Sequence, residues 1–368
     1  MGEWKECKLG EVLNLKRGYD LPKRLRKNGD IPIFSSSGIS GFHNKSKVEG
    51  VGVITGRYGT IGKVFLAQQA YWPLNTTLYV ENFKNNNEFF VYYFLQGINW
   101  EKFNDKSAVP GINRNDVHEE NVLLPSLPEQ KAIASTLSCL DDKIDLLHRQ
   151  NKTLEAMAET LFRQWFIEEA EDDWEEKSLY DCIKLIGGGT PKTSIDEYWN
   201  GDIGWLSAKD ITPNHKSIVL STEKTITTEG LNNSSTKILP QFSTIISARG
   251  TVGKYAILAE NMAFSQSNYG IIPEYQDCYF FTYLLVANVV DQLISAAYGS
   301  VFDTITTKTF KEHSVTVPLE KEIINFEKEI SPIFFKILNN AAQIRTLENL
   351  RNTLLPKLMS GEVRVRYD

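Results

Sequence analysis

A motif rich in glycine and lysine occurs twice in this chain and is its clearest candidate for a functional site. Gly56-Arg-Tyr-Gly-Thr-Ile-Gly-Lys63 returns as Ala248-Arg-Gly-Thr-Val-Gly-Lys254, one residue shorter, and the two lysines are 191 positions apart (254 − 63). Glycine permits a tight turn that brings the backbone close to a ligand. Arginine and lysine donate hydrogen bonds to phosphate or guanine. The motif therefore predicts a ligand-binding turn, and the alternative is a turn in a sheet whose lysine faces water.

The motif does not fit a nucleotide-hydrolysing P-loop, which requires G-x-x-x-x-G-K-[ST]. With Gly62-Lys63 fixed, the first glycine position holds Arg57 and the Ser/Thr position holds Val64; the second copy has Ala248 and Tyr255 there. The sequence also lacks the Asn-Pro-Pro-Tyr motif of amino-methyltransferases and the G-x-S-x-G motif of hydrolases. Two copies without catalytic motifs favour a pair of binding sites over an enzyme.

The repeat extends well beyond the motif. Leu74-Asn-Thr-Thr77 corresponds to Ser265-Gln-Ser-Asn268 on the same offset, and Gly29-Asp-Ile31 corresponds to Gly201-Asp-Ile203. Trp4 with Leu9 likewise returns as Trp174 with Leu179. A chain of 368 residues is long enough for two domains that each bury a core. Strand-like runs mixed with a helix in each copy predict two α+β modules, which suit a ligand with two similar sites.

Charge is distributed unevenly along the chain. The net charge of −6 and the pI of about 5.6 argue against a surface coated with phosphate-binding residues. Residues 1–125 nevertheless carry 16 Lys and Arg against 13 Asp and Glu, whereas residues 126–177 carry 6 against 13. The densest basic run comprises Lys16-Arg17, Lys23-Arg24 and Arg26-Lys27. It is a candidate phosphate-contacting strip, or else a solvated surface loop.

Several classes of protein are not indicated by the sequence. The amino terminus lacks the layout of a signal peptide, and there is no run of about 20 apolar residues. We therefore expect a cytoplasmic protein that has no membrane partner. The four cysteines are far apart, and the five histidines show no metal-ligand spacing. We expect no metal site.

Each repeat is followed by a predicted long helix. The first begins at Ser126-Leu-Pro-Glu129, which has the serine and glutamate of a capping box, and the second begins near Glu320. Apolar residues at alternating steps of three and four give a heptad stripe typical of a coiled coil. The predicted core of the helix pair comprises Leu140, Ile144, Leu147, Asn151, Leu154, Ile333, Ile337, Asn340, Ile344 and Leu347. Pro332 is expected to kink or split the second helix.

The two helices are expected to pack on each other in antiparallel orientation, because each stripe is too apolar to face water. A helix from Glu129 to Phe166 would be ~57 Å long, about one and a half turns of DNA. Asn151 and Asn340 interrupt their stripes near the middle, and buried asparagines fix the register of a coiled coil. We expect them to face each other; the alternative is that each points at solvent.

Two further phrases make the sequence resemble a known family. Leu124-Pro-Ser-Leu-Pro-Glu-Gln-Lys-Ala-Ile-Ala134 leads into the first helix, and Leu354-Leu-Pro-Lys-Leu-Met-Ser-Gly-Glu362 closes the second. Together with the repeated motif and the internal duplication, they resemble the specificity (S) subunit of type I restriction-modification systems over nearly the whole chain. One departure is Pro318-Leu-Glu-Lys-Glu322, where the family usually repeats a Pro-x-x-x-Gln pattern.

The resemblance implies an α+β chain of two tandem α/β target-recognition domains joined by two long antiparallel coiled-coil helices. The domains would be residues 1–125 and 171–318, and the spacer helices residues 126–170 and 319–362. It implies a non-catalytic subunit that reads double-stranded DNA with a bipartite target. Methylation (M) subunits would dock on the helices, and a restriction (R) subunit would join the complex. S-adenosylmethionine, ATP and magnesium would belong to those partners, and this chain would bind no cofactor.

The DNA contacts that this resemblance implies lie in and around the repeated motif. In the first module they are Arg57, Lys63, Asn75, Thr76 and Arg114, and in the second Arg249, Lys254, Gln266, Ser267, Asn268 and Lys308. Asparagine and glutamine can pair with adenine, and arginine and lysine with guanine. The rival interpretation is an interaction scaffold that uses its coiled coil and does not bind DNA.

Overall fold

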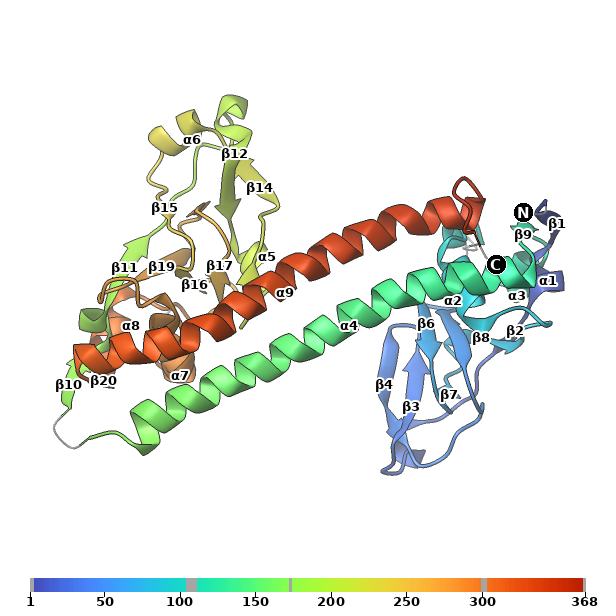
Figure 1. The fold of residues 1–368 in the computed structure, drawn as a ribbon, viewed down its shortest axis with the longest axis horizontal. Coiled ribbons are helices and arrows are strands. Elements are labelled where there is room, and N and C mark those ends of the chain that lie inside the picture. Colours follow the sequence, from blue (N-terminus) through green and yellow to red (C-terminus); the bar gives the residue numbers. More distant parts are fainter. Residues whose placement is uncertain (1–2, 104–110, 172–173, 299–302, 367–368) are drawn as a thin grey trace. The chain divides into compact units, whose positions relative to one another are not determined.

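The computed structural model describes residues 3–103, 111–171, 174–298 and 303–366 (Figure 1). It divides into two compact units, one made of Met1–Asp145 with Thr346–Asp368 and the other of Leu146–Arg345. Each unit holds one module together with part of each long helix. The predicted α+β class with two long antiparallel helices is confirmed.

The module of the first unit contains three sheets. Their strand orders are β2-β8-β5-β6, β4-β3-β7 and β1-β9. The strands are β1 (Lys5–Lys8), β2 (Asn14–Arg17), β3 (Ile31–Ser35), β4 (Gly38–His43), β5 (Gly52–Gly56), β6 (Val64–Ala67), β7 (Trp72–Pro73), β8 (Thr77–Asn82) and β9 (Asn121–Leu124). The helices are α1 (Leu9–Val12), α2 (Glu88–Gln96) and α3 (Arg114–His118), with short 3-10 turns η1 (Lys23–Leu25) and η2 (Trp100–Phe103).

The module of the second unit repeats this plan and adds to it. Its sheets have the orders β11-β19-β16-β17-β13, β14-β12-β18-β15 and β10-β20. The strands are β10 (Glu175–Ser178), β11 (Ile183–Gly187), β12 (Trp199–Leu206), β13 (Ile218–Val219), β14 (Lys224–Ile226), β15 (Ile238–Leu239), β16 (Thr244–Ser247), β17 (Tyr255–Leu258), β18 (Met262–Phe264), β19 (Asn268–Pro273) and β20 (Ser314–Val317). The helices are α5 (Ala208–Ile211), α6 (Thr228–Asn232), α7 (Tyr279–Tyr298) and α8 (Thr307–Glu312), with 3-10 turns η4 (Leu179–Cys182) and η5 (Asp196–Tyr198).

Corresponding strands occupy corresponding places in the two modules. β2-β8-β5-β6 in the first matches β11-β19-β16-β17 in the second, and every neighbouring pair in these four-strand sets is antiparallel. The parallel pair β3·β7 likewise matches β12·β18. The duplication seen in the sequence is therefore a duplication of topology.

The long helices are α4 (Leu127–Arg163), followed by a π-helical turn η3 (Gln164–Glu168), and α9 (Glu320–Ser360). The expectation that Pro332 splits the second helix is wrong, because α9 is continuous through it. A proline inside a helix costs about 3 kcal/mol. Burial of Ile330 and Phe334 on either side, at 0% and 3% exposure, offsets that cost.

Two contacts within the second unit show that α4 and α9 run antiparallel. Asn340 Nδ2 donates to Asn151 Oδ1 at 2.8 Å, and Asn151 Nδ2 donates to the Ile337 carbonyl at 3.3 Å. In η3, directly after α4, the ring of Phe166 lies 4.8 Å from that of Phe326 in α9. The two asparagines face each other as predicted.

The side chains at the other predicted core positions of the helix pair are all at least partly buried. Ile144, Leu147, Ile337 and Ile344 are buried, and Leu140, Leu154, Ile333 and Leu347 are half-buried. In the first unit Arg351 Nη1 pairs with Asp141 Oδ1 at 2.7 Å, and the Tyr93 hydroxyl donates to the other oxygen of that carboxylate at 2.6 Å. The heptad stripe thus identified residues on the buried faces of both helices.

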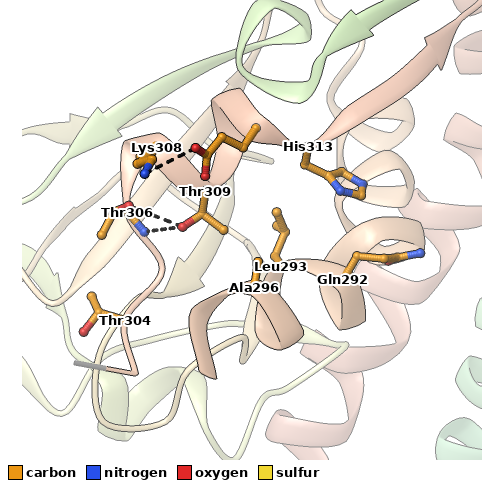
Figure 2. A pocket seen from close by; sticks show the side chains of 9 residues that line it. Gln292, Leu293, Ala296, Thr304, Thr306, Lys308, Thr309 and His313 are labelled. Atoms are coloured by element: carbon orange, nitrogen blue, oxygen red, sulfur yellow. Dashed lines mark hydrogen bonds and ion pairs between the residues drawn. The ribbon is translucent and has the colours of Figure 1, made fainter. Parts of the chain in front are cut away.

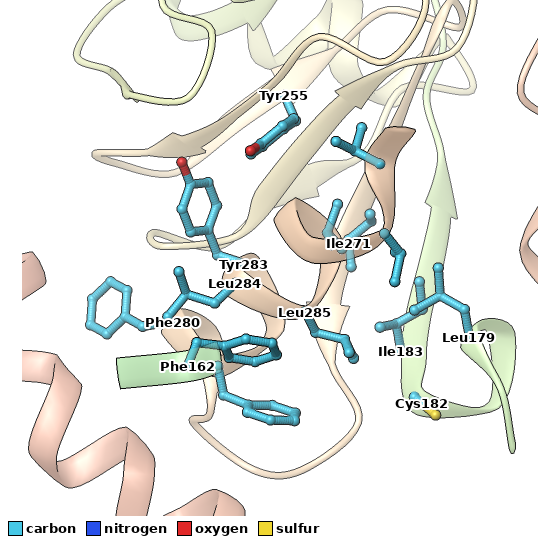
Figure 3. Close-up of a cluster of buried hydrophobic side chains, with 14 of the residues drawn as sticks. Phe162, Leu179, Cys182, Ile183, Tyr255, Ile271, Phe280, Tyr283, Leu284 and Leu285 are labelled. Atoms are coloured by element: carbon cyan, nitrogen blue, oxygen red, sulfur yellow. The ribbon is translucent and has the colours of Figure 1, made fainter. Parts of the chain in front are cut away.

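The core of the second unit is built around α7 (Figure 3). Leu284 and Leu285 of α7 lie between the sheet and Phe162 of α4. Phe280 of α7 stacks on Phe334 of α9, with ring centroids 4.5 Å apart. By length and composition alone α7 could span a membrane, but 61% of its most apolar stretch is buried in this unit. Its apolar character is explained by this core.

The start of α4 is fixed inside the first unit by a buried carboxylate. Glu129, predicted as part of a capping box, is 1% exposed. It accepts hydrogen bonds from Arg364 Nη2 at 2.7 Å and from the Trp4 indole at 3.3 Å. The segment after α9 is thereby tied to the beginning of α4 and to Trp4, which directly precedes β1.

Candidate nucleic-acid interface

Both copies of the repeated motif form the loop of a β-hairpin, between β5 and β6 in the first module and between β16 and β17 in the second. Gly59 and Gly62 have φ of 75° and 84°, and Gly250 and Gly253 have φ of 78° and 79°. Residues with a side chain rarely adopt such angles. The predicted tight turn is confirmed, and the glycines are required by its backbone.

The polar run that follows each motif in the sequence is bonded to the hairpin loop. The Arg57 and Tyr58 amides donate to the Thr76 carbonyl at 2.9 Å and 3.3 Å. In the second module the Ala248 amide donates to the Ser267 carbonyl at 2.9 Å. The structure therefore brings together two segments that the sequence had suggested separately.

A third segment, at the entrance to a short helix, joins the same loop. The Ile112 amide donates to the Arg57 carbonyl at 3.0 Å, and the Ile305 amide donates to the Ala248 carbonyl at 3.1 Å. These contacts lie two and three residues before the candidates Arg114 and Lys308, which belong to α3 and α8. Both candidates therefore belong to the segments gathered at the loop.

A fourth segment reaches the same loop and was not predicted from the sequence. In the first module it is the turn after β3, where Ser36 Oγ would lie 3.4 Å from a Cβ placed on Gly59. In the second it is α5 and its end, where Thr212 Oγ1 donates to Thr251 Oγ1 at 3.1 Å. The repeat of Gly29-Asp-Ile31 could have revealed this segment, because its offset of 172 carries Ser35 at the end of β3 onto Ser207 just before α5 (35 + 172).

The predicted contact residues differ in exposure. Lys63, Arg114, Arg249, Gln266 and Lys308 are exposed, Arg57, Asn75, Thr76, Lys254 and Ser267 are half-buried, and Asn268 is buried. Asn268 is 1% exposed, and its Nδ2 donates to Ser265 Oγ at 2.8 Å. We therefore assign Asn268 to holding the polar run in place. Asn75 is held from outside the motif, since its amide donates to Asp20.

A histidine supports the interface in each module. His215 Nδ1 accepts from the Tyr255 amide at 3.3 Å, and burial, followed by the positive charge of Lys254, lowers the pKa of His215. His118 Nε2 accepts from the Leu15 amide at 2.9 Å, and burial, followed by Arg114, lowers the pKa of His118. Each ring nitrogen is an acceptor only while it is unprotonated. The lowered pKa values favour that form at neutral pH.

Two cavities of the second module adjoin candidate residues. One, of about 350 Å³, lies between α7 and α8, where Lys308 points toward Glu312 with a separation of 3.3 Å (Figure 2). The other, also of about 350 Å³, is bordered by Gln266 and Ser267 together with Trp205 and Lys209. Among the residues that the structure describes, no cluster of histidine, cysteine or acidic side chains could hold a metal ion.

The sequence pattern of the family described as "Type I restriction modification DNA specificity domain" matches residues 1–156 and 171–352. This chain belongs to that family. The two matched ranges contain the two modules, so the resemblance drawn from the motifs is confirmed. Members of this family determine the DNA sequence specificity of type I restriction systems.

Individual relatives agree with this assignment. The chain is 25% identical over 280 residues to the type I restriction enzyme MjaIX specificity subunit of Methanocaldococcus jannaschii, covering 70% of this chain and 64% of that subunit. It therefore spans less than two thirds of that relative. It is 24% identical over 329 residues to the HindI specificity subunit of Haemophilus influenzae, covering 69% and 71%.

A solved structure shows the same fold. The S subunit of the type I restriction-modification system from M. genitalium superposes with a TM-score of 0.71 at 17% identity, covering 97% of this chain and 96% of that one. At this identity the likeness concerns the fold alone.

Proposed function

We propose that this chain is the sequence-specific DNA-binding subunit of a type I restriction-modification complex, and that each module reads one half of a bipartite target. The observation that carries the proposal is the double assembly of four segments around a glycine-built hairpin loop, once in each module. Those segments present Lys63 and Arg114 in one copy and Arg249, Gln266 and Lys308 in the other. Such side chains can bind phosphates and base edges.

We further propose that the pair α4·α9 sets the length of the unread spacer and is the docking surface for the methylation subunits. The acidic side chains between residues 126 and 177 suit a protein partner better than DNA. S-adenosylmethionine chemistry would reside on the methylation subunits, and ATP with magnesium on the restriction subunit. The complex would act in the cytoplasm.

The proposal is tested by co-expressing the chain with the methylation subunit of its own system and sequencing a random DNA library for methylated adenines. We expect a motif of two half-sites separated by a gap of fixed length. An assembled complex without a methylated motif would contradict the proposal and support the scaffold that binds proteins only.

A matched pair of variants assigns the half-sites to the modules. Arg249→Ala with Lys254→Ala should relax the second half-site only, and Arg57→Ala with Lys63→Ala the first only. Removal of one bidentate hydrogen-bond pair to a base reduces discrimination by about 1–3 kcal/mol. Equal loss of discrimination at both half-sites, or no loss at either, would contradict the assignment of one module to one half-site.

A further inference from the structure

A second surface of the first module combines exposed apolar side chains with a high density of cations. It is formed by η1 and by β4. β4 is an edge strand of the sheet β4-β3-β7 (Figure 1). Leu25, Ile39 and Phe42 are 57%, 58% and 54% exposed. Large side chains left this open in a cluster mark a surface that binds something. We call η1 and β4, with the residues exposed on them and the exposed Lys27 bonded to β4, the β4 face.

A β-bulge places the two apolar residues of β4 on one side of the sheet. Phe34 pairs with Ile39 and Pro32 pairs with Phe42, so that a single residue of β3 opposes both Ser40 and Gly41. Without the bulge, residues three apart would point to opposite faces of a strand. Ile39 and Phe42 instead share the face of Phe34 and Pro32.

Basic side chains are frequent in the segments that precede and follow this pair in the sequence. Residues 23–47 contain six Lys and Arg against one Asp, in a chain whose net charge is −6. Lys23, Arg24, Lys27, Lys45 and Lys47 are all exposed. The segment that carries the first of them lies against β4, because Arg26 Nη1 donates to the Ser40 carbonyl at 2.9 Å and the Lys27 amide donates to His43 Nδ1 at 3.0 Å.

The β4 face is continuous with the candidate interface. The turn that joins β3 to β4 contains Ser36, whose Cβ would lie 3.2 Å from a Cβ placed on Gly56 and whose Oγ would lie 3.4 Å from one on Gly59. A partner held at the hairpin loop therefore meets the beginning of β4 directly. A surface with this many cations favours a polyanion as its partner. The proposed function already places a DNA duplex on the hairpin loop, and that duplex is the polyanion nearest to the β4 face.

We propose that the β4 face is a second DNA contact of the first module: its cations bind phosphates along a minor groove, and Ile39 and Phe42 enter that groove and open a base step. The inference rests on the proposed function. Apolar side chains flanked by arginine and lysine are used in this way by proteins that kink DNA from the minor groove. Such a contact contributes specificity because some DNA sequences are easier to deform than others, and it requires no hydrogen bonds to base edges.

The experiment uses the complex with the methylation subunit and a duplex that carries the methylated motif of the wild-type complex. The charge variant is Lys23→Gln/Arg24→Gln/Lys27→Gln, and the apolar variant is Ile39→Ser/Phe42→Ser. Ile238→Ser is the matched control, because Ile238 is an exposed strand residue, at 43%, in the second module. Affinity is measured over a range of salt concentrations, and 2-aminopurine is moved through the duplex to report unstacking.

The charge variant should bind on the order of tenfold more weakly at low salt, and the slope of log K against log salt should fall by ~0.9 for each phosphate that is no longer bound. The apolar variant should lack an unstacking signal that the wild type and Ile238→Ser both give near the first half-site. Unchanged affinity and salt slope in the charge variant would overturn the proposal, as would an unstacking signal that the apolar variant keeps. Loss of the methylation subunit from the charge variant, with DNA binding intact, would overturn it too, because the face would then bind a protein.

These outcomes are separate from a failure of the proposed function. That failure appears in the wild-type complex, as the absence of any methylated motif. The further inference is tested only against a wild type that binds and methylates its target. Every replaced side chain is exposed, so thermal unfolding of each variant should match that of the wild type.

Discussion

At the scale of single residues, Gly250 and Gly253 have nearly the same backbone angle in different surroundings. Their φ values are 78° and 79°. A Cβ on Gly250 meets nothing within 4 Å, whereas one on Gly253 would lie 2.3 Å from Ile294 Cγ1. The pair therefore separates the cost of the backbone angle from the cost of a clash with α7.

We expect Gly250→Ala to lower the free energy of unfolding by roughly 1–2 kcal/mol, the strain of a left-handed residue with a side chain. Gly253→Ala should lower it by about 1–3 kcal/mol more, because the half-buried Ile294, which packs against the core, must move. Urea unfolding of the full chain, followed by tryptophan fluorescence, measures both. Equal destabilisation by the two replacements would contradict a clash between a side chain at position 253 and Ile294.

The sequence revealed the turn but only part of the interface. Gly-Thr-x-Gly-Lys and the polar run could be found because both copies keep their residue types and spacing. Asn268 resembles its exposed neighbours in type, and only the packing of the loops buries it. The contact of Ser36 with the hairpin loop depends on how β3 pairs within its sheet, which no local spacing encodes.

At the scale of elements, the join between α4 and α9 centres on a polar pair. Asn340 is 0% exposed and Asn151 is 9% exposed, and each donates a hydrogen bond across the helix pair. A single Asn340→Leu replacement leaves Asn151 Oδ1 without its donor, while Asn151 Nδ2 keeps the Ile337 carbonyl, and we expect a loss of about 1–3 kcal/mol. The double replacement by leucine should recover that loss or exceed the wild type, since two apolar residues suit the stripe.

The measurement is a double-mutant cycle of urea unfolding, with disulfide crosslinking between engineered cysteines to report helix register. Crosslinks at more than one register should appear in the double variant, because the polar pair no longer selects one alignment. A double variant with wild-type stability and a single register would show that the pair does not specify alignment.

A carboxylate on α4 makes the stability of the second unit depend on pH. Burial, followed by the nearby charge of Glu159, raises the pKa of Glu155 from 4.5 to about 7. The folded state therefore favours the protonated form. Its contribution to stability is complete below pH 4.5, declines as the pH rises, and is lost above about 7.

Glu155→Gln should remove this dependence. Because Glu155 is only partly buried, solvent screening reduces the effect to about 1–2 kcal/mol. We expect the variant to be more stable than the wild type by that amount at about pH 8, and the two to converge toward about pH 5. Urea unfolding at both pH values measures it, with Glu329→Gln, an exposed position of α9, as the control. A difference that does not change with pH would contradict the prediction.

Long elements were predicted better than short ones. Heptad spacing identified α4 and α9 because the pattern is sustained over many turns. The split expected at Pro332 is absent from α9, where buried neighbours on both sides offset one missing hydrogen bond. The short α5 and α6 have too few residues to show a period, and side-chain caps such as Thr227 Oγ1 accepting from the Gly230 amide determine them.

At the scale of the whole molecule, the two compact units do not follow the order of the chain. One unit takes the beginning of α4 and the end of α9, and the other takes the end of α4 and the beginning of α9. Glu129 with Arg364, 235 positions apart, is bonded within the first unit. A sequence pattern predicts which face of a helix is buried, but not which module covers each end.

The point where both helices pass from one unit to the other offers a test of the proposed spacer role. The division falls between Asp145 and Leu146 in α4 and between Arg345 and Thr346 in α9. Duplicating Cys139–Asp145 together with Thr346–Asn352 adds one heptad to each helix. The added heptads repeat Leu140 and Leu347 of the stripe and keep the Asp141–Arg351 ion pair. Pairing should therefore survive.

Seven residues lengthen a helix by ~10.5 Å, which equals about three base pairs at ~3.4 Å each. We expect the methylated motif to keep both half-sites and to contain a gap that is longer by about three base pairs. The rate of methylation should fall, because the two rotations do not match. Three base pairs turn the duplex by roughly 100°, while a heptad turns an α-helix by only ~20°. Sequencing of methylated adenines gives the gap directly. Duplicating Cys139–Asp145 alone should abolish methylation by misaligning the helices, whereas an unchanged gap in the double insertion would mean that the helix pair does not set the spacer.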